Sequence, residues 1–194
     1  MPDQPRFSDI AVRGADLRTA TWGSGPFVLG IHGITASSVS LAPVARVVAA
    51  SRTFVAPDLR GRGGSAAAPG PFGMSAHASD CADLIEAGAD GPVVVLGHSM
   101  GAFVAVVLAA TRPDLVERLV LVDGGLPIPV PIEVDVDAAM EMLLGPSLAR
   151  LRMTFDSVAA YEDYWKAHPA LATSWNEDIE AYLAYDLEGE APSL

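Results

Sequence analysis

The feature that most constrains the fold is a short apolar run that ends in a serine flanked by glycines. Residues 93–96 read Val-Val-Val-Leu, Gly97-His98-Ser99-Met100-Gly101 follows, and an apolar segment spans residues 102–110. The first run predicts a buried strand and the later segment a helix. The joining turn must be tight enough to hold the serine in a strained conformation, with its hydroxyl clear of the sheet. Glycine is needed at 97 and 101 because side chains there would collide with the neighbouring strand and helix.

The rest of the first 125 residues alternates between strand and helix patterns, which indicates an α/β sheet. Strands are expected at residues 7–12, 17–22, 27–31, 53–56, 93–96 and 119–122. Helices are expected at residues 38–50, from about residue 75, and at 100–112. The first two strands are expected to form a hairpin that turns at residues 14–16.

From residue 135 onward only helical patterns occur. Gly145-Pro146 is expected to separate two helices, and a capping box at residues 174–177 is expected to open the last one. We therefore divide the chain into a core at residues 1–126 and a helical segment at residues 127–194.

Charge is distributed unevenly along the 194 residues. The net charge is −12, and residues 133–194 hold three basic and thirteen acidic residues. This balance argues against nucleic acid and anionic membranes as partners. The acidic segment is either a solvated helical surface or a surface that faces a basic segment outside this chain.

Several features of the sequence favour a cytoplasmic protein. The longest apolar run, residues 102–110, is far shorter than the roughly 20 residues that span a bilayer. The N-terminus shows no signal-peptide pattern, and the single cysteine, Cys81, cannot form an internal disulfide.

Four motifs stand in order along the core. They are His32-Gly33, Pro-Asp-Leu-Arg-Gly-Arg-Gly-Gly-Ser at residues 57–65, the serine turn, and Leu-Val-Leu-Val-Asp at residues 119–123. With these motifs the chain resembles the α/β-hydrolase fold family over residues 7–125. The resemblance implies a mostly parallel sheet flanked by helices, and residues 133–190 resemble the helical cap of many members. The last strands of the family sheet are expected to be missing.

The resemblance also implies site residues. Ser99 would be the nucleophile that forms an acyl-enzyme. Backbone N–H groups of Met100 and Ile34 would form the oxyanion hole. Loop-shaping roles are expected for His32, Gly33 and His98. Serine at this position disfavours dehalogenation and epoxide hydrolysis, because relatives with those activities carry aspartate there.

Hydrolysis of carboxylic esters or lactones is therefore the favoured activity. Carbon–carbon or amide bond hydrolysis by the same fold, and a non-catalytic binding protein, remain alternatives. Aromatic residues of the cap either line an apolar pocket for a hydrophobic substrate or pack only among themselves. They are Tyr161, Tyr164, Trp165, Trp175 and Tyr182.

The catalytic histidine has no candidate in this chain. In the family it follows the last strand, and none of the four histidines (His32, His77, His98 and His168) stands where a general base is expected. The triad acid is either Asp123 or a carboxylate beyond the chain. A nicked protein with a separate C-terminal fragment, a truncated chain, and a member that lost catalysis are three open explanations.

No cofactor or metal is expected. The glycine-rich loop at residues 59–65 lacks the G-x-G-x-x-G spacing of dinucleotide-binding sites and the lysine of a phosphate-binding P-loop. No cysteine–histidine cluster suggests zinc. Asp58 and Arg60 are expected to hold this loop, and Cys81 is expected to be a core residue.

Overall fold

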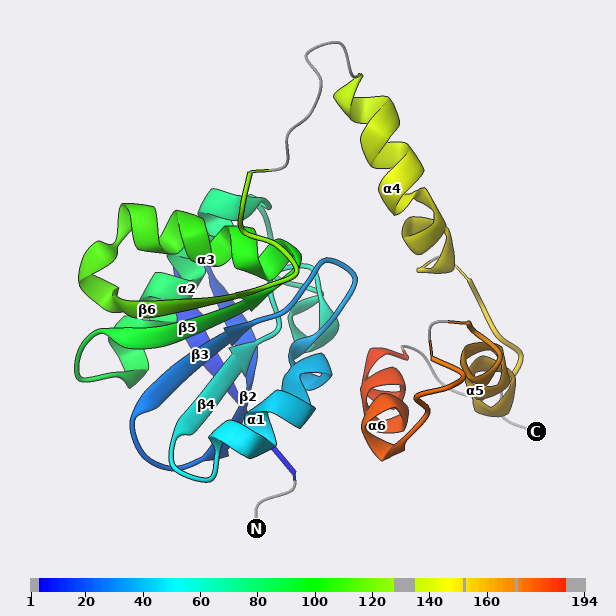
Figure 1. The fold of residues 1–194 in the computed structure, drawn as a ribbon, viewed down its shortest axis with the longest axis horizontal. Helices are drawn as coiled ribbons and strands as arrows, with labels where there is room; N and C mark the ends of the chain where they lie inside the picture. The colour runs from blue at the N-terminus through cyan, green and yellow to red at the C-terminus, as the bar shows by residue number, and fades with distance from the viewer. Residues whose placement is uncertain (1–3, 128–134, 152, 170, 188–194) are drawn as a thin grey trace. The chain divides into compact units, whose positions relative to one another are not determined.

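The computed structural model describes residues 4–127, 135–151, 153–169 and 171–187. It divides into two compact units, Met1–Gly125 and Leu126–Leu194 (Figure 1). This division lies one residue before the boundary expected after residue 126.

The first unit contains a six-stranded sheet. Its strands are β1 (Arg6–Val12), β2 (Ala15–Gly23), β3 (Phe27–Ile31), β4 (Thr53–Pro57), β5 (Val93–His98) and β6 (Val116–Val122). They lie in the order β1-β2-β4-β3-β5-β6. The β1–β2 and β2–β4 pairs are antiparallel, whereas β4, β3, β5 and β6 run parallel. The expected mostly parallel α/β sheet is confirmed.

The β1–β2 hairpin turns one residue earlier than expected. Val12 pairs with Ala15, so Arg13 and Gly14 form a two-residue loop. Gly14 has a φ of +76°. The second residue of this loop has a positive φ, which glycine adopts without steric cost, and this places Gly14 inside the turn.

Helices cover both faces of the sheet (Figure 1). Helix α1 (Ala42–Val48) packs on one face, against a cluster that includes Trp22 and Phe54. Helices α2 (Met74–Gly88) and α3 (Met100–Thr111) pack on the other face. Successive strand residues alternate between the two clusters, because side chains point to opposite faces of a sheet.

The expected helix over residues 38–50 forms in two parts. A 3₁₀ turn, Ser38–Leu41, precedes α1. Pro43 lies in the first turn of α1, where its missing N–H has no intrahelical partner to lose. Proline therefore sets the start of the α-helix.

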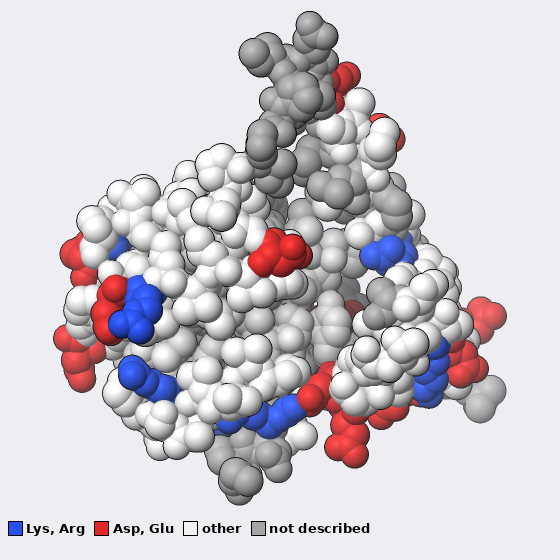
Figure 2. Space-filling view, in the orientation of Figure 1, with Lys and Arg blue, Asp and Glu red and all other residues white. Residues whose placement is uncertain are grey.

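The second unit is helical. It contains α4 (Val136–Arg150), α5 (Val158–Lys166) and α6 (Glu177–Asp186). The expected break at Gly145-Pro146 is wrong: α4 continues through both residues, since the proline removes one backbone hydrogen bond while the helix extends on either side. Figure 2 shows acidic side chains gathered on this unit.

The start of α6 also differs from expectation. Its N-cap is Asn176, not Ser174. Asn176 Oδ1 accepts hydrogen bonds from the backbone N–H groups of Asp178 at 2.9 Å and Ile179 at 3.1 Å. Asparagine caps helices as well as serine does, and here its side chain accepts hydrogen bonds from two N–H groups of the first turn. No helix in the described part of the chain is long and apolar enough to cross a membrane.

Candidate active site

Ser99 lies at a sharp turn between β5 and α3. Its φ is +52° and its ψ is −119°, a conformation that non-glycine residues rarely adopt. The Ser99 N–H donates a hydrogen bond to the Val122 carbonyl at 2.9 Å, which ties the turn to the end of β6. Strain of this kind costs about 1–3 kcal/mol and persists only where the surrounding structure enforces it.

Close backbone approach explains the two glycines of the turn. A Cβ on Gly101 would press against the Ile31 carbonyl oxygen at the end of β3. A Cβ on Gly97 would lie 2.6 Å from the Ala102 Cα at the start of α3. The collisions expected with the neighbouring strand and helix are therefore present, and Ser99 is held where β3, β5 and α3 converge.

The turn after β3 lies directly beside Ser99. A Cβ built on Gly33 would be 3.2 Å from Ser99 Cβ and 3.4 Å from His98 Nδ1. The Ile34 side chain is 38% exposed. The structure thus brings together Ser99, His98, Gly33 and the residue after Gly33.

His32 fixes the orientation of this turn. Its side chain is fully buried, and Nδ1 lies 2.7 Å from the Gly33 carbonyl oxygen. The Leu59 N–H donates to Nε2 at 3.0 Å. A carbonyl can only accept, so Nδ1 carries the proton and the ring is neutral. Burial is the main cause that lowers the pKa of His32 to about 4.

The peptide bond between Gly33 and Ile34 gives this hydrogen bond a second consequence. Gly70-Pro71 is the cis peptide bond of the described chain, so the Gly33–Ile34 bond is trans. In a trans peptide the C=O and N–H groups point in opposite directions. By holding the Gly33 carbonyl, His32 turns the Ile34 N–H away from itself, which leaves that N–H available to another acceptor.

Met100 is the first residue of α3. The first N–H groups of a helix have no intrahelical acceptor, and the helix dipole favours negative charge at this end. The Met100 side chain is half-buried and packs against the core cluster beneath α2 and α3. Its N–H therefore has the character of an anion-binding group beside Ser99.

Asp123 lies in the turn that follows β6. Its side chain is exposed and its φ is +54°. A Cβ on the next residue, Gly124, would lie 2.5 Å from the Ser99 carbonyl oxygen. The turn that holds Asp123 therefore passes close to the Ser99 backbone at the end of the neighbouring strand.

The four histidines occupy different places. His98 is half-buried beside Gly33, and His77 is buried in α2, where its Nδ1 has no hydrogen-bond partner among the described residues. Burial lowers the pKa of His77. The His168 ring stacks near Trp165 in the second unit, with 5.4 Å between centroids. Within the described residues, no hydrogen bond joins any of these rings to Ser99 Oγ.

Asp58 and Arg60 hold the glycine-rich loop. The Asp58 carboxylate accepts from the Ser38 N–H at 2.7 Å and from the Gly64 N–H at 2.8 Å. Arg60 forms a buried two-pronged ion pair with Asp80 of α2, at 2.6 and 2.7 Å. Sequence reasoning missed Asp80, although an aspartate among the apolar positions of an otherwise buried helix face was a usable signal.

Cys81 is buried in the core cluster under α2, and burial raises the pKa of its thiol. A reactive thiolate is not expected at such a place. No group of three or more potential metal ligands of the His, Cys, Asp and Glu types occurs within the described residues.

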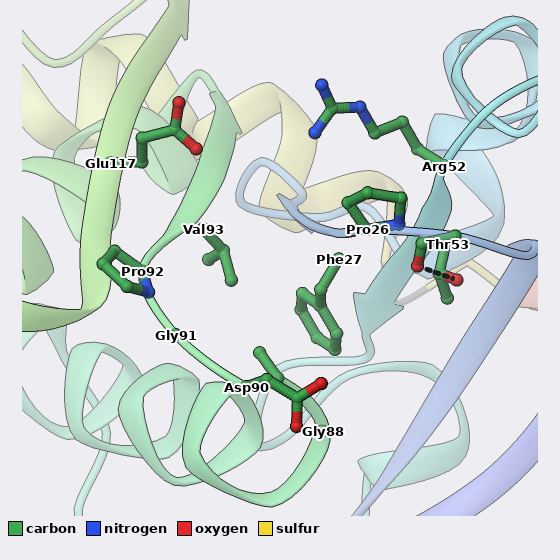
Figure 3. Close-up of a pocket in the computed structure, with 12 residues that line it drawn as sticks. Pro26, Phe27, Arg52, Thr53, Gly88, Asp90, Gly91, Pro92, Val93 and Glu117 are labelled. Carbon is green, nitrogen blue, oxygen red and sulfur yellow. Dashed lines mark hydrogen bonds between the residues drawn. The ribbon is translucent and has the colours of Figure 1, made fainter.

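A hollow of about 450 Å³ lies at the opposite end of the sheet from Ser99 (Figure 3). Phe27, Thr53 and Val93 line it, and they are the first residues of β3, β4 and β5. Ligands of open α/β sheets bind outside the carboxyl ends of the strands. Ser99 lies at that carboxyl end, so we do not assign the hollow to catalysis.

Aromatic side chains of the second unit pack on one another. Phe155 contacts Tyr161 and Tyr164, with ring centroids 5.1 and 5.6 Å apart. Trp165 lies 5.4 Å from Tyr164, and Lys166 Nζ lies 5.5 Å from the Trp175 ring. Tyr161, Tyr164 and Trp165 therefore pack against one another, and the lining of a substrate pocket by the cap aromatics stays a prediction.

Comparison with known proteins gives a family match. The family model described as alpha/beta hydrolase fold matches residues 26–185. Lipase LipV of Mycobacterium tuberculosis is 44% identical over 110 residues, which are 56% of this chain and 41% of LipV. A soluble epoxide hydrolase of Corynebacterium sp. is 36% identical over 113 residues, which are 58% of this chain and 39% of that enzyme.

Among solved structures, E-2-(acetamidomethylene)succinate hydrolase superposes with a TM-score of 0.73 at 27% identity. The match covers 93% of this chain and 64% of that one. The chain spans less than half the length of the curated relatives it matches.

Proposed function

Because the chain belongs to the α/β-hydrolase fold family, we propose that it is the nucleophile-bearing part of a serine hydrolase. The observation that carries this proposal is the strained Ser99, whose neighbour in space is the Gly33-Ile34 turn. A serine held with positive φ at the end of a parallel strand presents its hydroxyl to a substrate instead of to the core.

The proposed reaction is two-step acyl transfer. Ser99 Oγ attacks the carbonyl carbon of the substrate, and its proton passes to a general base. The tetrahedral intermediate carries its negative charge on the former carbonyl oxygen, between the N–H groups of Ile34 and Met100. The alcohol then leaves with a proton, and water releases the acid from Ser99. Losing one such oxyanion donor costs about 10²- to 10³-fold in rate.

We propose that the general base is a histidine on a further polypeptide segment of the same protein. Two facts support this: among the described residues no histidine is hydrogen-bonded to Ser99, and the chain spans 64% of its solved relative. Asp123 is the proposed triad acid within this chain, because its turn is anchored against the Ser99 backbone. A carboxylate on the further segment is the alternative.

Having serine at position 99 limits the reactions that this chain could catalyse, within a family that includes epoxide hydrolases. Opening an epoxide through a covalent intermediate needs a carboxylate nucleophile, whereas a serine acts on acyl groups. Carboxylic esters or lactones with an apolar part are the substrates that we propose, in keeping with the similarity to a lipase. Amide hydrolysis is the second candidate, favoured by the similarity to the acetamidomethylene-succinate hydrolase.

Chemical rescue tests the proposal on this chain. The chain would be incubated with p-nitrophenyl acetate, with and without free imidazole as a replacement base, and acetylated peptides identified by mass spectrometry. Acetylation of Ser99 that imidazole accelerates is expected, with only background acetylation in its absence. Ser99→Ala and Ser51→Ala, an exposed serine, are the matched controls. Absence of the adduct at Ser99 under all conditions would favour a non-catalytic binding protein.

A further inference from the structure

The guanidinium group of Arg62 holds the C-terminal end of the turn after β3 (residues 33–36), which lies beside Ser99. Arg62 donates from Nε to the Ala36 carbonyl at 3.2 Å and from Nη2 to the Thr35 carbonyl at 3.0 Å. Both donors belong to one planar group, so the two carbonyls are fixed relative to each other as well as to Arg62. The end of the turn is therefore held by the Arg62 side chain.

The backbone of Arg62 is itself anchored. Its N–H donates to the Leu59 carbonyl at 2.9 Å, and its carbonyl accepts from the Ser65 N–H at 2.8 Å. Leu59 is joined to the ring of His32 at 3.0 Å. The glycine-rich loop is thus hydrogen-bonded to His32, the residue after β3, at one point and to the end of the turn at another.

The turn depends on these hydrogen bonds because its conformation is unfavourable. Thr35 has a φ of +64°, which is rare for a β-branched residue. On the near side, the Gly33 carbonyl accepts from His32 Nδ1 at 2.7 Å and from the Ala36 N–H at 3.3 Å. Arg62 holds Ala36 in turn. Ile34 therefore lies between two hydrogen-bonded points. His32 holds the Gly33 carbonyl before it, and Arg62 holds the carbonyls of Thr35 and Ala36 after it.

We infer that Arg62 is a positioning residue for acyl transfer at Ser99, because its hold on Thr35 and Ala36 keeps the Ile34 N–H oriented as an oxyanion donor. This inference rests on the proposed function. The turn lies against the nucleophile, with 3.2 Å between Ser99 Cβ and the Cβ position of Gly33. A small rotation of the turn therefore changes where the donor points. The hydrogen bond from His32 to the Gly33 carbonyl would remain without Arg62, so a partial loss of the acylation rate is expected.

The test measures imidazole-assisted acylation of Ser99 against ester concentration. Arg62→Gln is expected to lower the maximal rate about tenfold, a fraction of the effect of losing an oxyanion donor outright, with the half-saturating ester concentration little changed. Arg62→Lys, which can reach one carbonyl, is expected to fall between. Arg52→Gln is the control, because Arg52 is exposed at the opposite end of the sheet (Figure 3). A maximal rate unchanged in Arg62→Gln would overturn the inference.

A double-substitution cycle separates positioning from general stability. Ile34→Pro deletes the N–H that Arg62 is inferred to orient. In that background Arg62→Gln should have no further effect on the rate, whereas an equal tenfold loss in both backgrounds would overturn the inference. If Ile34→Pro fails to fold, amide hydrogen exchange at Ala36, whose N–H donates to the Gly33 carbonyl, takes its place: faster exchange in Arg62→Gln supports the inference, and unchanged exchange overturns it. Wild-type chain that is never acylated would overturn the proposed function first.

Discussion

Buried polar side chains hold the loops after β3 and β4 in place. The Arg60 guanidinium meets Asp80 with two hydrogen bonds and also donates to the carbonyls of Pro69 at 2.8 Å and Arg13 at 2.6 Å. Its side chain is 4% exposed and that of Asp80 is 2% exposed. A buried ion pair offsets its desolvation cost only when its donors and acceptors are satisfied, as they are here.

Removing the charge of one member of this pair should therefore lower the stability of the fold strongly. Asp80→Asn leaves a buried guanidinium without its counter-charge, and we expect it to lower the free energy of unfolding by about 3–5 kcal/mol. Urea denaturation followed by circular dichroism measures this. The matched control is Asp9→Asn, since Asp9 forms the exposed pair with Arg18 at 2.7 Å. That change should cost below about 1 kcal/mol, and equal losses in the two variants would contradict the argument.

His32 makes stability depend on pH. Burial is the main cause that lowers its pKa from 6.5 to about 4. Between these two values the unfolded chain binds a proton that the folded chain does not, so stability falls as the pH decreases from about 6.5 to 4. The shift corresponds to about 3 kcal/mol in all. Below pH 4 both states are protonated and this group causes no further loss.

NMR titration of the histidine ring protons measures the pKa of His32 directly, and urea midpoints measured across the same pH range give the stability. In His32→Asn the part of the pH dependence due to this ring should vanish, while the remaining slope reports the other groups. A His32 ring that titrates near 6.5 would show that it is not held neutral in the folded chain.

Whole elements could be predicted where the signal is local. The apolar runs of β3 and β5, and the glycines around Ser99, specify strand, turn and helix within a few residues, and the structure agrees to within two residues for most elements. The pairing of Arg60 with Asp80 and the positive φ of Thr35 could not be predicted in this way. Both depend on contacts between segments 20 or more residues apart, which no local pattern encodes.

The turn at Ser99 (residues 97–101) provides a prediction at the scale of elements. Gly101→Ala would force its Cβ against the Ile31 carbonyl and 2.6 Å from the His32 carbonyl oxygen, so α3 would have to move away from β3. We expect a loss of about 1–3 kcal/mol or more, as for overpacked cores, together with loss of Ser99 acylation. Gly91→Ala is the control, because nothing lies within 4 Å of a Cβ at that position.

Urea denaturation and the imidazole-assisted acylation assay would both be applied to these two glycine variants. Gly91→Ala should match the wild-type chain in both. If Gly101→Ala kept wild-type stability and acylation, the close approach of α3 to β3 would not be needed to form the turn at Ser99.

At the scale of the molecule, the sheet ends at β6, whose last four residues, 119–122, are apolar. β6 is the last strand of the six, paired to β5 on one side. Leu119 and Leu121 pack into the core cluster, whereas Val120 and Val122, on the opposite face, are 39% and 44% exposed. Soluble proteins usually protect such an edge with charges, proline or a covering element. This edge has the properties of a surface that another strand would complete.

We therefore expect the isolated chain to self-associate through β6 as its concentration rises, which sedimentation velocity would detect. Val120→Lys should reduce the association, because a charge on the open face of the edge strand disfavours further pairing. Val47→Lys is the matched control: Val47 is 77% exposed on α1, so it removes an exposed valine and adds the same charge away from the edge. Equal reductions in both variants would indicate that net charge, not the β6 edge, governs association. A chain that stays monomeric at every concentration would show that the edge is already protected.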